Sequence, residues 1–479
     1  MTPSRRQFLR TSAAYAAGFA GLRALTHPAL ASAAQQATAV AGYGNLLDDP
    51  SGLLDLPAGF SYRIIGRTGD LMDDGLLISG APDGMATFEG PDGLTLLVRN
   101  HETMPGQAGP YGTEMDGGER YKKVDPAFLY DNGAGVSPAI GGTSTVVYDT
   151  RSQKVVRQFQ SLAGTERNCA GGPTPWGSWI TCEETVDRPG YIQDPNSSFT
   201  VEKAHGYNFE VPATAQPELA QPTPLIDMGR FRHEAVAVDP RTGIVYETED
   251  VDDGLIYRFL PNKPGAPDQG GSLAAGGKLQ ALAVIGQESI DTRNWFDLSV
   301  RVGDSLPVQW IDLYDTESPE DDLRYRGNDL GAAVFARGEG MWHAESGELG
   351  EVYFACTSGG AKRIGQIWKY TPSPTEGQPG ESSSPGTLEL FLEPNDSNLI
   401  QNADNLTTSP WGDLIVCEDR QGDVVRLVGV TPQGGCYTLA NNRVRGEFAG
   451  VTFSPDGSTL FVNLQTEGMT VAITGPWRS

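Results

Sequence analysis

One type of segment recurs six times along this chain, and it constrains the fold more than any other feature. Each copy begins with small or polar residues, forms a short apolar strand, turns at Pro or Gly, and returns through a second strand to a polar or acidic end. Apolar residues alternate on both sides of the turn, as they do in half-buried β-hairpins. The six copies are residues 83–102, 168–184, 233–250, 338–358, 403–419 and 447–465.

A strand-rich unit repeated in this way predicts an all-β fold, a six-bladed β-propeller with long inserted loops and an axial metal site. Further strands, such as GLIYRFL (254–260) and GQIWKY (365–370), follow several copies. The spacing between copies is irregular, and a two-domain β protein is therefore the alternative. We assign the irregular spacing to insertions near residues 103–140, 186–225, 263–330 and 371–386.

Residues 1–34 are predicted to be a twin-arginine signal peptide. SRRQFL (4–9) carries the arginine pair, an Ala-rich apolar stretch follows from 11 to about 25, and small residues at 29–33 suit cleavage. A disordered basic N-terminus is the alternative. We expect export by the Tat machinery to the periplasm or the medium. Residues 35–479 would then form a single β-propeller catalytic domain.

The strongly acidic composition limits the partners. The formal net charge is −26, so the surface should repel nucleic acid and anionic lipid. Beyond the N-terminus no apolar run reaches the roughly 20 residues that cross a bilayer, so we expect no stable membrane insertion. A monomer is the default expectation. Many carboxylates serve either solubility or the binding of divalent cations.

In a propeller the first residues of each inner strand, and the ends of the next strand, face one end of the axis. Aligning the copies on their turn glycines places Glu183, Glu249, Glu418 and Asn463 at one equivalent position. A structural zinc site is not expected, because the five cysteines form no CxxC pair. The strand-start positions are Cys169, Glu234, Glu339, Asp404 and Glu447, and the strand-end positions include Glu102, Glu183 and Glu249.

So many carboxylates in one cavity cannot all be ionised without cations, because like charges raise each other's pKa. Dense oxygen ligands suit Ca²⁺, and a thiolate among them suits a transition metal. A free Cys169 could instead be a small buried apolar side chain, and Glu183 and Glu184 could be a solvated strand end.

Five segments carry specific motifs: NCAGGPTPWGSWITCEE (168–184), RFRHEA (230–235), ARGEGMWH (336–343), DNLTTSPWGDLIVCED (404–419) and EFAGVTFSPDGSTLFVNLQ (447–465). Together they resemble the PhoX family of secreted alkaline phosphatases. The resemblance covers most of residues 50–477, and the cysteine segment is its most specific part. This chain is shorter than many members of that family, which leaves its substrate range open.

The resemblance implies a metal centre with two Fe³⁺ ions, bridged by an oxo group and a cysteine thiolate, beside two or three Ca²⁺ ions. Cys169 would then be the bridging thiolate and Glu234 and Glu339 iron ligands, while Arg337 would grip the phosphate. The calcium-ligand candidates are Glu183, Glu249, Asp404 and Glu447, and Glu102 lies in a further matching segment, RNHE.

The predicted activity is hydrolysis of phosphate monoesters to inorganic phosphate by an exported, metal-dependent alkaline phosphatase. No G-x-S-x-G motif points to a serine nucleophile, and the few histidines argue against a di-zinc site. The alternatives are a calcium-dependent propeller hydrolase, such as a lactonase or a phytase-like enzyme, and a non-enzymatic binding propeller stabilised by calcium.

Overall fold

The computed structural model describes residues 37–112, 119–135, 137–192, 200–266 and 269–478. They belong to one compact unit, Gln36–Ser479. The predicted signal peptide, residues 1–34, lies outside the described part. This part is nearly all β-structure, with one α-helix, α2 (Leu323–Asp329). Its 3₁₀ turns are η1 (Pro91–Gly93), η3 (Tyr121–Lys123), η4 (Pro126–Phe128), η5 (Gly133–Gly135), η6 (Ile226–Met228), η7 (Leu273–Ala275) and η8 (Glu381–Ser383).

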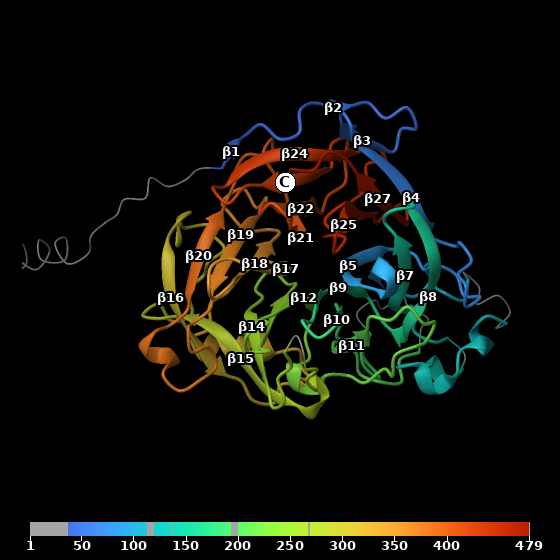
Figure 1. Ribbon diagram of the computed structural model, residues 1–479. Helices are drawn as coiled ribbons and strands as arrows, with labels where there is room; N and C mark the ends of the chain where they lie inside the picture. The colour runs from blue at the N-terminus through green and yellow to red at the C-terminus, as the bar shows by residue number, and fades with distance from the viewer. Residues whose placement is uncertain (1–36, 113–118, 136, 193–199, 267–268, 479) are drawn as a thin grey trace, which may run out of the picture. The chain divides into compact units, whose positions relative to one another are not determined.

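The strands form antiparallel groups that follow one another along the chain (Figure 1). The first group is β5 (Pro82–Glu89), β6 (Thr95–His101), β7 (Gly141–Asp149) and β8 (Lys154–Thr165). The second is β9 (Asn168–Pro173), β10 (Ser178–Glu183) and β11 (Asn208–Pro212). The third is β12 (His233–Val238), β13 (Val245–Glu249), β14 (Ile256–Pro261), β15 (Gly277–Val284) and β16 (Ser305–Asp312).

The fourth group is β17 (Gly338–Ala344), β18 (Glu351–Cys356), β19 (Gln366–Thr371) and β20 (Thr387–Leu392), and β20 pairs with β16 to join groups three and four. The fifth is β21 (Ala403–Thr408), β22 (Leu414–Glu418), β23 (Arg426–Val430) and β24 (Gly435–Asn442). The short strands β1 (Thr38–Ala39), β2 (Leu46–Leu47) and β3 (Leu54–Pro57) extend its β24 edge.

The sixth group joins the two ends of the described chain. It consists of β25 (Phe448–Phe453), β26 (Thr459–Leu464), β27 (Met469–Thr474) and β4 (Ser61–Arg67). The N-terminal β4 pairs antiparallel with the C-terminal β27, from Ser61 opposite Thr474 to Arg67 opposite Met469. The last sheet is therefore completed by a strand from the start of the chain.

The first strands of the six groups pack against one another in a closed cycle, β5–β9–β12–β17–β21–β25 and back to β5. We call these six strands the inner ring. Their labels lie close together in the middle of Figure 1, and the last strands β16, β20, β24, β4 and β8 lie further out.

Neighbouring groups share buried apolar clusters, because both faces of most strands are covered. Adjacent residues of a strand point to opposite faces, so Leu97 packs toward the sixth group and Val98 toward the second. In the same way Ile367 and Trp368 of β19 belong to two different clusters. This explains why these strands are continuous apolar runs as well as alternating ones.

Two expected insertions contain part of the sheet. The range 263–330 includes β15 and β16, and 186–225 includes β11. In β11 the alternating apolar residues Phe209 and Val211 are fully buried. In the part of the chain that the structure describes, no helix is long and apolar enough to cross a membrane.

Candidate metal centre

Each inner-ring strand carries one extra residue near its start. In β12, His233 is opposite Glu249 and Val236 is opposite Glu247, so three steps on one strand match two on the other. The same irregularity occurs in β5, β9, β17, β21 and β25. Such a β-bulge interrupts the ladder and redirects the side chains of the extra residues.

The bulge places chemically similar residues at equivalent positions. The first bulge residue of each strand, in chain order, is Asp83, Cys169, Glu234, Glu339, Asp404 and Gly450. The second is usually small, because the ring strands approach closely there. A Cβ added to Gly84 would lie 2.5 Å from the Cα of Ala170. The fold thus directs a thiol and four carboxyl groups toward one region.

Donor atoms from these positions form two overlapping groups. Cys169, Glu184 and Glu234 each offer a donor atom within 4.8 Å of the other two, and so do Glu234, Glu339 and Asp404. Glu234 belongs to both groups. The exposed fraction of Cys169, Glu234, Glu339 and Asp404 is between 2% and 6%. One carboxylate between a sulfur-containing group and an all-oxygen group is an arrangement that suits more than one cation.

The carboxyl groups of this region raise one another's pKa. Burial, followed by Glu339 and Glu184, raises the pKa of Glu234 well above its usual value. Burial and neighbouring acids also raise the pKa of Asp83, Glu184, Glu339, Asp404, Asp419 and Glu447. We call this set, together with Cys169, Glu102, Glu234 and Asp250, the acidic cluster.

Arg337 lies at the edge of the acidic cluster. Its Nε donates to Oδ1 of Asp250 at 2.8 Å and its Nη2 to Oδ2 at 2.9 Å. Nη2 also donates to Oε1 of Glu339 at 2.5 Å. Nη1 is 3.5 Å from a carboxylate oxygen of Asp419. With a third of the side chain exposed, Nη1 is the part of the guanidinium best able to bind an anion from outside.

A second arginine, Arg167, occupies the corresponding place on another strand. Its Nη2 donates to Glu102 at 2.9 Å and to Glu184 at 2.7 Å. Its Nε is buried without a hydrogen-bond partner. Like Arg337, it precedes the first bulge residue of its strand by two positions, and both have positive φ.

Glu183 and Glu249, two of the expected calcium ligands, are not brought into the donor groups. Glu183 accepts hydrogen bonds from the backbone N–H of Glu166 and Gly206 and from Nδ1 of His205. Glu249 accepts from the N–H of Leu255 and the hydroxyl of Tyr257. Their repeat equivalent Glu418 likewise accepts from Arg426. These carboxylates tie the strand ends to the neighbouring chain.

The structure therefore gathers Cys169, Glu234, Glu339 and Asp404, and keeps Glu102 and Glu447 nearby. Glu102 shares Gln465 with Asp83, and Asp419, Asp83 and Glu102 contribute to the raised pKa of Glu447. Sequence reasoning missed Asp83 and Arg167 and did not select Glu184, Asp250 or Asp419 as ligands. The recurrence of R-x-C at 167–169 and R-x-E at 232–234 and 337–339 could have found Arg167.

The remaining cysteines and the histidines have structural surroundings. All five cysteines are free and buried. His101 contacts the carbonyl of Gly80 and the hydroxyl of Ser144. Burial lowers the pKa of His205, but Glu183 and Asp131 raise it well above the usual value. Among the described residues, the donor groups contain no histidine.

Comparison with one solved structure, at a TM-score of 0.66, agrees with this fold. PhoX of Pseudomonas fluorescens, solved with vanadate as a transition-state analogue, is 18% identical, with 92% of this chain and 98% of that one covered and a TM-score of 0.66. A gluconolactonase of Xanthomonas campestris is 12% identical, with 91% and 99% covered and a TM-score of 0.36. No curated protein sequence matches this chain.

The family comparison is more specific. The family model described as alkaline phosphatase PhoX matches residues 41–468, which is most of the chain and includes every strand of the inner ring. The relationship and the phosphatase class predicted from the sequence are confirmed, and this chain belongs to the PhoX family of alkaline phosphatases.

Proposed function

We propose that this protein is an exported phosphatase that hydrolyses phosphate monoesters to inorganic phosphate at a mixed-metal centre inside a six-bladed propeller. The observation that carries the proposal is the position of Glu234, shared between a thiol-containing donor group and an all-carboxylate one. Two Fe³⁺ ions and two or three Ca²⁺ ions are the proposed cations. The closed inner ring and the apolar clusters between successive groups support six blades.

The residues fit bound cations on three grounds. First, oxygen donors suit calcium, and a thiolate beside carboxylates suits a transition metal. Second, the acidic cluster holds many more carboxyl groups than arginines, and burial raises the pKa of most of them. Third, Oδ1 of Asp83 is buried without a hydrogen-bond partner. An unpaired buried carboxylate oxygen is costly unless something positive approaches it.

The proposed ligands follow from the two donor groups. Cys169, Glu234 and Glu184 would hold one side of the centre, and Glu339 and Asp404 the other. Asp83, Glu102 and Glu447 would complete the calcium sites. Glu183 and Glu249 are proposed instead to fix the strand ends behind the ligands.

Cations at this position would supply positive charge to the phosphate and the leaving oxygen and activate water for attack. The chain's own contribution is orientation. Asp250 holds the guanidinium plane of Arg337 through two charge-assisted hydrogen bonds. Nη1 has only the longer contact with Asp419, at 3.5 Å, and is the nitrogen that would bind the phosphate oxygens. The low exposure of the donor groups excludes bulk water and strengthens these interactions.

Location and assembly are also part of the proposal. The SRRQFL segment supports export by the twin-arginine machinery to the periplasm or the medium. A monomer is proposed, with small-molecule phosphate esters as the substrates. The net charge of −26 argues against binding to nucleic acid.

The decisive experiment is elemental analysis of the exported protein, combined with hydrolysis of a chromogenic phosphate ester. Cys169→Ala should remove iron, visible absorption and activity together. Cys436→Ala is the matched control, because that thiol is also buried but lies in β24, far along the sheet from the inner ring. An active, coloured Cys169→Ala protein would contradict the bridging role. Wild-type protein that gains activity only with zinc would overturn the assignment of the metals.

A further inference from the structure

An aromatic and cationic surface lies beside Arg337, on two loops that contribute nothing to the acidic cluster. It consists of Trp295 and Phe296 in the β15–β16 connection and of Lys362 and Arg363 in the β18–β19 connection. We call these four residues the aromatic rim. In a protein of net charge −26, cations beside exposed aromatic rings are a candidate binding site for an anionic ligand.

Direct hydrogen bonds fasten the rim to the segments that hold Arg337. The indole Nε1 of Trp295 donates to the carbonyl of Ser358 at 2.6 Å, and the N–H of Thr357 donates to the carbonyl of Arg337 at 3.1 Å. On the other side, Nη1 of Arg293 donates to the carbonyl of Asp252 at 3.0 Å, two residues beyond Asp250. The rim is therefore attached to the two segments that carry Arg337 and Asp250.

Asn294 orders the backbone of the connection that carries Trp295 and Phe296. Its side-chain oxygen accepts from the N–H groups of Ser299 and Val300, at 2.9 and 3.1 Å. Its amide donates to Glu393 and to the carbonyl of Val300, at 2.7 Å each. A binding surface ordered in advance loses less entropy when a ligand arrives.

Two cations of the rim are free to interact with a ligand. The guanidinium of Arg363 stacks 4.1 Å from the ring centre of Trp295 and 5.7 Å from that of Phe296. Within the described ranges, no hydrogen bond or ion pair joins a carboxylate to the side chain of Arg363 or Lys362; only the backbone N–H of Lys362 donates, to Oδ1 of Asn395. Asp297, the residue after Phe296, is exposed.

Phe296 is the most exposed large apolar side chain of the described part, at 83%. Its phenyl ring gains free energy only when another apolar or planar group covers it. The Arg363 guanidinium lies 5.7 Å from the centre of that ring, and Lys362 precedes Arg363 in the chain, so the surface attracts negative charge. Together they suit a planar group that carries an anion.

We propose that the aromatic rim binds the leaving group of the substrate, and that it selects phosphate monoesters whose leaving group contains an aromatic ring and a negative charge of its own. This inference rests on the proposed function, because the phosphate must sit at Arg337 for the leaving group to reach the rim. Phe296 provides the stacking surface, and Arg363 and Lys362 provide the positive charge.

The test compares three esters on the metal-loaded protein: 4-carboxyphenyl phosphate, phenyl phosphate and glycerol 2-phosphate. Wild-type kcat/KM should be highest for the first. Phe296→Ala should lower kcat/KM for both aryl esters by about three- to ten-fold, and Arg363→Gln should lower it by a similar factor for the carboxylated ester alone. For glycerol 2-phosphate, both variants should match wild type.

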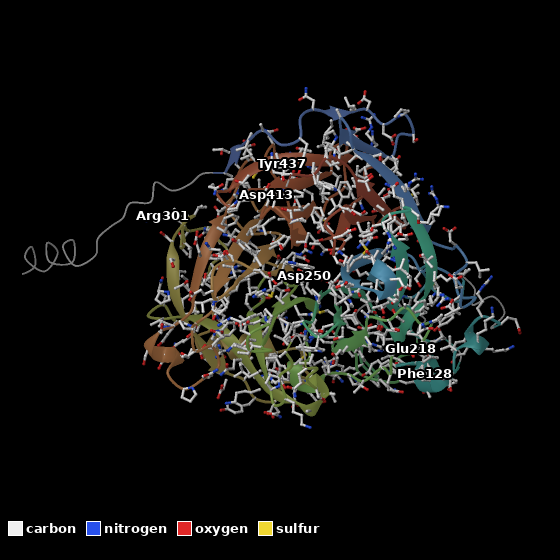
Figure 2. All side chains as sticks on the ribbon, in the orientation of Figure 1. Phe128, Glu218, Asp250, Arg301, Asp413 and Tyr437 are labelled. Atoms are coloured by element: carbon white, nitrogen blue, oxygen red, sulfur yellow. The ribbon has the colours of Figure 1, made fainter. Side chains whose placement is uncertain are left out.

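Matched controls separate the rim from general effects. Arg301→Gln removes an exposed cation from the same β15–β16 connection. Figure 2 labels Arg301 at the left margin of the fold and Asp250 near its centre. Tyr314→Ala removes an aromatic ring that is 71% exposed elsewhere. Neither should alter the order of the three esters. Rim variants that lower all three esters equally, or none of them, would overturn the proposal.

Failure of the proposed function gives a different result. If the loaded wild-type protein hydrolyses none of the esters, the function is wrong. In that case the binding of 4-carboxyphenyl phosphate, measured by the change in tryptophan fluorescence, tests the role of the aromatic rim independently of hydrolysis. Weaker binding by Phe296→Ala and Arg363→Gln than by the control variants supports the rim, and equal binding contradicts it.

Discussion

Replacing Glu183 by Gln tests whether this carboxylate is structural. Both oxygens are surrounded by donors: the N–H of Glu166 at 2.9 Å and Nδ1 of His205 at 2.7 Å on one, and the N–H groups of Gly206 and Tyr207 at 2.9 and 3.3 Å on the other. A glutamine amide can place its oxygen toward only one side. Its NH₂ group then faces two buried donors, which lose their acceptor.

The expected loss of stability follows from those two donors. A buried donor left unpaired costs about 1–3 kcal/mol, so the loss should be about 4 kcal/mol. The unfolding entropy is about 2.1 cal/mol/K per residue. For the unit Gln36–Ser479, the melting temperature should therefore fall by about 4 °C.

Glu234→Gln should have the opposite effect in protein stripped of cations. Burial, Glu339 and Glu184 raise the pKa of Glu234 above its ordinary value of 4.5. When the pH rises above that value, the Glu234 carboxyl group ionises in the unfolded protein before it does so in the folded protein. The folded state then binds one more proton than the unfolded state, and it loses stability as the pH rises further. A neutral glutamine removes this penalty. At pH 8 the stripped variant should melt no lower than wild type, but it should fail to bind metal.

Calorimetry of the chelated proteins at pH 8, with elemental analysis of the loaded ones, checks both expectations. Glu183→Gln should melt lower and keep its metals. If it keeps its melting temperature and loses a metal ion, Glu183 is a ligand and the structural assignment is wrong. A stripped Glu234→Gln protein that melts several degrees below wild type would contradict the mutual repulsion of the acidic cluster.

Three further expectations follow from the geometry. Gly84→Ala should destabilise the protein by about 1–3 kcal/mol, because the added Cβ would meet Ala170. The control Gly270→Ala has open space around the added Cβ and should leave the melting temperature measured by calorimetry unchanged. Arg337→Ala should retain its metals but lose about 10- to 100-fold in kcat/KM for a phosphate ester, and unchanged kinetics would exclude phosphate binding by this residue. Burial and neighbouring acids raise the pKa of Glu339 and Asp404, so the melting temperature of the protein stripped of cations should fall as pH rises from about 6 to 9. Added Ca²⁺ should raise the melting temperature more at pH 9 than at pH 6, and a melting temperature that does not change with pH would contradict this.

Much of the fold could be predicted from the sequence because its signal is local. The six hairpin segments coincide with the strand pairs that begin each group, and alternating apolar residues place those strands between two covered faces. Cys169, Glu234, Glu339 and Asp404 were expected at strand starts, and the structure brings their donor atoms together.

The remaining members of the acidic cluster could not be chosen because side-chain direction at a strand end changes with every residue. Glu183 and Glu184 are adjacent, yet Glu183 turns to backbone donors and Glu184 to Cys169 and Glu234. The pair Glu249 and Asp250 divides in the same way. Aligning the segments on their turn glycines selects Glu183 and Glu249, the first acid of each pair. The sequence spacing does not reveal the one-residue bulge in each inner-ring strand.

The joining of β4 to β27 has a consequence for when the protein can take up its cations. The donors of the acidic cluster are spread from Asp83 to Glu447, and the last sheet needs residues 448–474 to pair with a strand made near the beginning of synthesis. A chain in which residues 448–474 have not yet been synthesised lacks that partner, so the inner ring cannot close and the cluster is not complete. If the cluster binds cations as proposed, the full set of ligands is available only once the last sheet has formed.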